Sequence, residues 1–167
     1  PPAASPTPTA PTATPPPAAP SGPAQPSGSN LLVNGDAEAG RGAGNDSEVF
    51  APPGWSVNGN LTAVQYGAPG GFIGPSDPGP SNRGKNYFVG GPSNGESSAS
   101  QTVNLAGNAS SIDGGSQTFT LSAWLGGWDG QDDTCSVRVS FQSASGSELR
   151  SANIGGVPSS ERNGGSA

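Results

Sequence analysis

Two stretches of alternating apolar and polar residues, 117–125 and 135–142, dominate the later part of the chain. Apolar residues recur at every second position around Phe119 in the first stretch and around Val137 in the second. This period of two is typical of β-strands with one buried face and one solvated face. The segment between them, GGWDGQDD, is rich in Gly and Asp, which favour turns and loops. The pattern predicts two antiparallel strands around a polar loop, with the face of Phe119 and Val137 as the centre of the core.

Shorter apolar runs predict the remaining elements, and none has the period of a long amphipathic helix. The Pro-Pro-Gly-Trp sequence that ends at Trp55 predicts a turn delivering an aromatic anchor. The first run ends in an Asn-Gly pair, which predicts a chain reversal at Asn34. The predicted further strands are residues 30–36, 61–66, 86–89, 98–105 and 147–154. Short strands separated by Gly-rich loops predict an all-β domain.

The composition divides the chain into two parts. Residues 1–29 hold 11 of the 19 prolines and no charged or aromatic residue, so we expect a disordered, extended Pro/Thr/Ala-rich linker. Residues 30–167 have a length that suits one β-sandwich domain. The last predicted strand would leave an exposed sheet edge, which native domains seldom tolerate, and residues 155–167 show no packing pattern. We therefore expect a domain truncated at its C-terminus, in a mature or excised piece of a longer protein.

Charge and residue chemistry exclude several function classes. The net charge is −6, so the clustered positive charge that nucleic acid needs is missing. No apolar run reaches the 18 or so residues of a membrane span, and no membrane partner is expected. The chain has no His, which excludes Ser-His and Cys-His nucleophiles, and the three carboxylates of the polar loop fit solvated loop residues better than a catalytic pair. No enzyme is expected. The single Cys135 shares the parity of Val137 and should be buried.

Several motifs, taken in order, resemble a galactose-binding-domain-like jelly roll. The start NLLVNGDAEAG is similar to the start of secreted carbohydrate-binding modules. The order NYFVGG, SSASQTVNL and LSAWLGGWDGQDD, followed by alternating valines, resembles the sugar-recognising domain of F-box proteins. The resemblance covers about residues 30–157. It implies a jelly-roll β-sandwich and a carbohydrate ligand.

Sugar recognition needs aromatic rings for the C–H faces of the sugar and planar polar groups for its hydroxyls. Trp124 has the parity opposite to the core residues, which predicts a place on the wet face near Arg138, although another element could cover it. Trp128 is either a ligand contact or a loop anchor. The predicted carbohydrate-binding residues are Trp124, Trp128, Asp129, Gln131 and Arg138.

A metal site is a further expectation of the resemblance, since related jelly rolls often hold a structural calcium near the turn after the first strand. In this chain that turn carries Asp36 and Glu38. Carboxylate oxygens suit calcium, whereas the absence of His and the single Cys exclude a zinc site of the usual kind.

These observations predict a secreted, non-catalytic carbohydrate-binding module, joined by its spacer to an N-terminal domain and targeting that domain to a polysaccharide or glycan. The alternatives are a structural or adhesive accessory domain that contacts protein, and an ancillary domain of an extracellular hydrolase.

Overall fold

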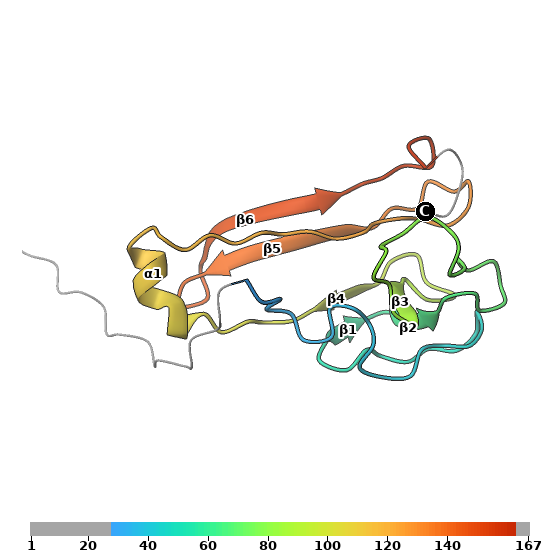
Figure 1. The fold of residues 1–167 in the computed structure, drawn as a ribbon, viewed down its shortest axis with the longest axis horizontal. Coiled ribbons are helices and arrows are strands. Elements are labelled where there is room, and N and C mark those ends of the chain that lie inside the picture. Colours follow the sequence, from blue (N-terminus) through green and yellow to red (C-terminus); the bar gives the residue numbers. More distant parts are fainter. Residues whose placement is uncertain (1–27, 163–167) are drawn as a thin grey trace, which may run out of the picture.

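The computed structural model describes residues 28–162, so the expected linker lies almost wholly outside the described residues (Figure 1). Six strands and two short helical turns are present in this part of the chain. In chain order they are β1 (Ser56–Asn58), β2 (Thr62–Gln65), β3 (Asn86–Val89), β4 (Ser98–Ser100), a 3-10 turn (Ala106–Asn108), α1 (Ala109–Asp113), β5 (Ser136–Gln142) and β6 (Glu148–Gly155). The described residues are therefore largely β, as the alternating patterns predict.

The strands form three antiparallel pairs: β1 with β4, β2 with β3, and β5 with β6. Val57 lies opposite Ala99 in the first pair, and Val64 lies opposite Tyr87 in the second. The β5–β6 pair is the longest of the three, with a bulge after Phe141 (Figure 1). Within the described residues, the three pairs are separate two-stranded sheets with no ladder of hydrogen bonds between them. The predicted strands over 61–66, 86–89 and 147–154 are confirmed in type and nearly in extent.

The core lies around β2 rather than around β5. Ala43, Val64 and Ala68 are buried together, with four partly buried residues packed against them: Phe50, Phe72, Tyr87 and Val89. Ala43 extends the sheet by one residue, because its N–H donates to Ala63 (2.7 Å) and its carbonyl accepts from Gln65 (3.0 Å). The prediction of a core on the Phe119 and Val137 face is therefore wrong.

The first predicted strand, residues 30–36, is a series of turns. Side chains satisfy main-chain groups locally there: Asn30 Oδ1 accepts from the Leu32 N–H (3.1 Å), and Asn34 Oδ1 accepts from the Ala39 N–H (2.8 Å). Such bonds compete with a strand ladder. The predicted reversal is confirmed, since Asn34 has φ of 51°. The predicted Trp55 anchor is also confirmed, with its ring 5.7 Å from that of Phe88 and its indole N–H donating to the Asn34 carbonyl.

Residues 117–125 form no strand, which corrects the prediction of a ladder with residues 135–142. The segment nevertheless runs beside β5 (Figure 1), and the rings of Phe119 and Phe141 lie 5.3 Å apart. The hydrogen-bonded neighbour of β5 is β6. Phe119 stays 37% exposed, although its ring packs against that of Phe141.

Three smaller differences complete the comparison. The strand predicted over 98–105 is shorter, and α1 forms in a segment for which no element was predicted. Cys135 is exposed rather than buried, although its neighbours partly desolvate the thiol and raise its pKa.

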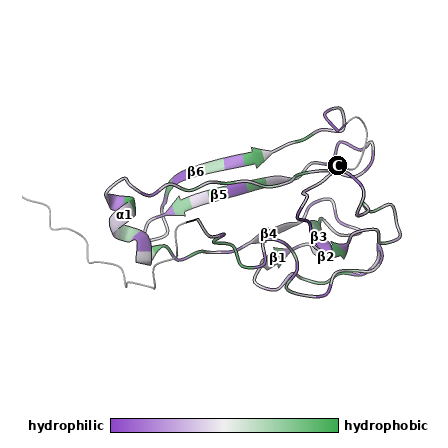
Figure 2. Cartoon of the chain, viewed as in Figure 1, coloured by the Kyte–Doolittle hydropathy of each residue, from purple (hydrophilic) through white to green (hydrophobic). Residues whose placement is uncertain are grey.

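Apolar and polar residues are interspersed along both β5 and β6 (Figure 2). No helix among the described residues is long and apolar enough to cross a bilayer.

Candidate functional site

The loop at residues 126–133 carries three of the predicted sugar-binding residues. Trp128 packs this loop against Phe72, which belongs to the residues around the buried cluster of Val64. The ring of Trp128 meets that of Phe72 edge to face, with centroids 5.3 Å apart and planes at 84°. A Cβ placed on Gly71 would lie 3.0 Å from the indole, so the ring rests directly on the glycine backbone. The side chain is half-buried in this position. Trp128 is thus a loop anchor, and whether it also touches a ligand stays a prediction.

The Asp133 side chain holds the loop at 126–133 in a closed turn by hydrogen bonding to the main chain of Trp128. Both of its carboxylate oxygens accept from the Trp128 N–H, at 2.9 and 3.0 Å, and the Trp128 carbonyl accepts from the Gln131 N–H at 3.0 Å. Asp129 has φ of 45°, in the left-handed region that Asp tolerates better than most residues. Asp129 and Gln131 both remain exposed to solvent. The structure therefore brings Trp128, Asp129 and Gln131 together in one ordered turn.

A turn at residues 158–162, which the sequence pattern did not predict, packs against this loop. We call it the C-terminal clamp. Arg162 Nη1 donates to the Asp129 carbonyl (3.0 Å), and Arg162 Nη2 donates to the Gln131 carbonyl (2.7 Å) and lies 3.7 Å from Asp133 Oδ1. Ser159 donates its hydroxyl and its N–H to Asp132 Oδ1, at 2.6 and 3.2 Å. These bonds hold the pKa of the Asp132 carboxyl below its usual value.

Trp124 lies on the segment that leads into this loop and is 72% exposed. It has no ring contact among the described residues, whereas Trp55 and Trp128 each have one. An exposed indole offers a flat apolar face with a polar N–H at its rim. The exposure predicted from its parity is therefore present, and its contact with a sugar stays a prediction.

Arg138 lies on β5 and is paired with Glu148 of β6. Its Nη2 donates to both oxygens of that carboxylate, at 2.8 and 2.7 Å, and Ser140 donates to Oε2 at 2.7 Å. The hydrogen bonds from Ser140, Arg138 and Ser151 lower the pKa of Glu148 to about 2. Arg138 is thus oriented along the β5–β6 face, and the predicted neighbourhood with Trp124 has no contact to support it.

The two predicted metal ligands lie in the turn after Asn34. Glu38 Oε1 accepts from the N–H groups of Lys85 and Asn86, both at 2.8 Å, and Asp36 Oδ1 accepts from the Glu38 N–H at 3.3 Å. In the part of the chain that the structure describes, no third His, Cys, Asp or Glu joins them as a ligand group. Two carboxylates supply fewer oxygens than the six to eight that calcium takes. These side chains alone do not make a calcium site, and calcium binding stays a prediction.

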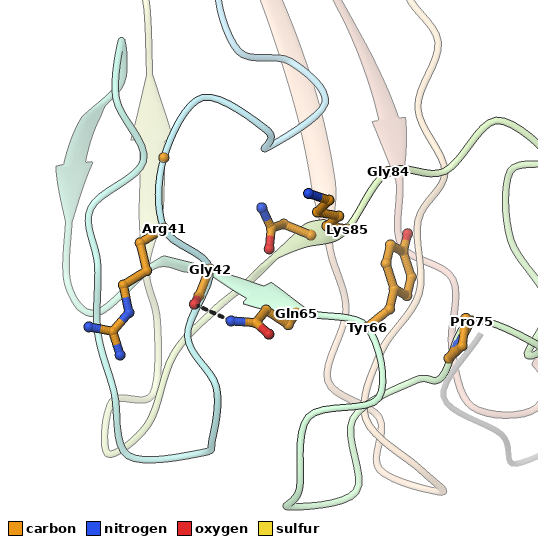
Figure 3. Close-up of a pocket in the computed structure, with 9 residues that line it drawn as sticks. Arg41, Gly42, Gln65, Tyr66, Pro75, Gly84 and Lys85 are labelled. Atoms are coloured by element: carbon orange, nitrogen blue, oxygen red, sulfur yellow. Dashed lines mark hydrogen bonds between the residues drawn. The ribbon is translucent and has the colours of Figure 1, made fainter.

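A hollow of about 510 Å³ lies where β2 ends and β3 begins (Figure 3). Its side chains are mainly polar and include Gln65, Tyr66 and Lys85. Gln65 donates to the Gly42 carbonyl at 2.9 Å, and the Tyr66 ring is already engaged by Tyr87 (4.7 Å) and by the Arg83 guanidinium (5.4 Å). The sequence pattern predicted the two strands beside this hollow but not the hollow itself.

Comparison with protein-family models, curated proteins and solved structures finds no match.

Proposed function

We propose that the chain is a non-catalytic carbohydrate-binding domain of a secreted multidomain protein, which targets its covalent neighbours to a polysaccharide or glycan. The exposure of Trp124 carries the proposal. At 72% exposed it is the most exposed large apolar side chain in the described part of the chain. A flat indole face exposed in this way can be stabilised by covering the apolar C–H face of a sugar, which an exposed aliphatic side chain does less well.

The neighbouring loop supplies the polar half of such a site. Exposed Asp129 and Gln131 offer a carboxylate and an amide beside Trp128, and the contacts described above hold their main chain in place. A hydrogen-bonded polar loop that follows the exposed Trp124 in the chain offers groups for both surfaces of a sugar ring, and prior ordering lowers the entropic cost of binding. For Arg138 to contact a sugar at this site, its hydrogen bonds to the Glu148 carboxylate must first break.

The motif resemblance supports a galactose-binding-like jelly roll as the complete fold, of which the three strand pairs would be parts. The Pro-rich spacer supports a tethered arrangement outside the cell, in which binding raises the local concentration of the attached domain at its target.

One observation favours a second candidate function. Nearly all of β6 is exposed, including Leu149 at 71%, and an open strand edge of this kind can pair with another protein. A structural or adhesive accessory domain would use this edge and leave Trp124 free of sugar.

A fluorescence titration of the whole chain tests the proposal. The probes are soluble gluco-, xylo-, manno-, galacto- and N-acetylglucosamine oligosaccharides. The proposal predicts a saturable change with one class that is lost in Trp124→Ala. Leu149→Ala is the matched control, since its side chain is equally exposed but lies on β6, and it should bind as the wild type does. A folded wild-type chain without any response would favour the accessory candidate.

A further inference from the structure

Arg162 is the one buried charged residue among those that the structure describes, with a side chain only 2% exposed. A guanidinium is costly to bury unless its donors meet acceptors. Two of its nitrogens donate to the carbonyls of Asp129 and Gln131, and Asp133 Oδ1 lies 3.7 Å from Nη2. The planar fork of arginine can hold two such carbonyls in a fixed relation, which a flexible ammonium does not.

The partners of Arg162 are main-chain groups of the two residues whose side chains the proposed function uses. We propose that Arg162 is the positioning residue of the sugar-binding loop, and that the C-terminal clamp fixes the directions in which Asp129, Gln131 and Trp128 face a ligand. The inference rests on the proposed function. Arg162 itself need not touch the sugar, because its donors are turned to the main chain of the loop.

The position of Gly127 is independent support for a close-fitted contact. A Cβ placed there would lie 2.5 Å from the Asp133 carbonyl oxygen and 2.6 Å from Arg162 Nη2. Any side chain would displace the loop or the guanidinium. Gly130, in the same loop, would place a Cβ with nothing within 4 Å. The two glycines therefore form a matched pair, one against the clamp and one away from it.

The test combines sugar affinity with hydrogen exchange of the loop amides in the full 167-residue chain. The probe is whichever oligosaccharide class gives saturable binding in the fluorescence titration. We expect Arg162→Ala to weaken affinity by about tenfold or more and to speed exchange of the Trp128 and Gln131 amides. Arg162→Lys keeps the charge without the fork and should restore part of both. Gly127→Ala should act like Arg162→Ala, and Gly130→Ala like the wild type.

Ser159→Ala is the milder variant if Arg162→Ala fails to fold, since it removes only the hydroxyl bonded to Asp132. A smaller loss of affinity together with faster loop exchange supports the proposal.

Faster loop exchange with unchanged sugar affinity in Arg162→Ala would overturn the positioning role and leave the proposed function standing. If the wild type binds no sugar, the proposed function fails by itself. Hydrogen exchange of the loop amides then tests only whether the C-terminal clamp orders the loop. Unchanged protection of the Trp128 and Gln131 amides in Arg162→Ala would overturn that role.

Discussion

The ring of Trp128 stands edge to face against Phe72, with centroids 5.3 Å apart, and this contact joins the loop at 126–133 to the buried cluster around Val64. Phe72 lies on the long Gly-rich segment after β2 and packs against that cluster. The loop is consequently held at two places, by an aromatic contact on one side and by the C-terminal clamp on the other. Trp124 has neither kind of support.

The two tryptophans should therefore differ in their contribution to stability. Trp128→Ala removes half-buried apolar surface and an aromatic pair, and we expect a loss of roughly 2 kcal/mol in the free energy of unfolding. Trp124→Ala removes an exposed side chain and should change it by less than about 0.5 kcal/mol. Urea unfolding followed by circular dichroism measures both. Equal losses in the two variants would contradict this assignment of anchor and platform.

The tight turn after β3 depends on Gly91. Its φ is 80°, and a Cβ there would overlap the main-chain carbonyl of Asn60. We expect Gly91→Ala to destabilise the chain by roughly 2–4 kcal/mol, from left-handed strain and overlap together. Gly95, in the same loop, has open space around its Cβ position, and Gly95→Ala should be close to neutral. A stability measurement in which both variants match the wild type would contradict the geometry of this turn.

The hydroxyl of Thr62 serves the buried part of β2. Thr62 is 1% exposed, and its Oγ1 accepts from the Phe50 N–H at 2.9 Å. Thr62→Val keeps the shape but leaves that donor without its partner, which should cost about 1–3 kcal/mol. Thr62→Ser keeps the hydroxyl and should lose less. Thermal unfolding compares the two, and a Val variant more stable than the Ser variant would show that this bond is not important.

The Arg138–Glu148 pair should make the β5–β6 hairpin sensitive to acid. The pKa of Glu148 is lowered from 4.5 to about 2 in the folded chain, so its stabilisation is complete above about pH 4.5 and is lost as the pH falls toward 2. Glu148→Gln should reduce the pH dependence of stability across this window. Glu96→Gln, at an exposed position before β4, is the control. Identical pH profiles for Glu148→Gln and the wild type would exclude the linkage.

Strands marked by a local apolar run or by alternation were predictable from the sequence. The Tyr-Phe-Val run gave β3, and the alternating valines gave most of β5. The exposure of Trp124 followed from parity in the same way. In these cases the signal is local, because side-chain direction in an extended chain depends only on position.

The core and the clamp were not predictable, for two physical reasons. Ala43 and Ala68 lie in Gly-rich segments, where small residues show no period, yet their size lets the backbones approach. Arg162 binds main-chain carbonyls some 30 residues earlier in the chain, and a carbonyl is present at every residue whatever its side chain. The failed strand at 30–36 has a third cause. There, the side-chain amide oxygens of Asn30 and Asn34 accept hydrogen bonds from backbone N–H groups that a strand ladder would otherwise use.

The most direct test of the central claim is fluorine NMR of the whole chain labelled with 5-fluorotryptophan, titrated with the oligosaccharide panel. The three tryptophans give three resonances, assigned by Trp→Phe variants. Sugar binding at the proposed site predicts a saturable shift of Trp124, a smaller shift of Trp128, and none of Trp55, which packs on Phe88 and is not part of the proposed site. A folded chain in which Trp124 stays unshifted with every sugar class would contradict the account.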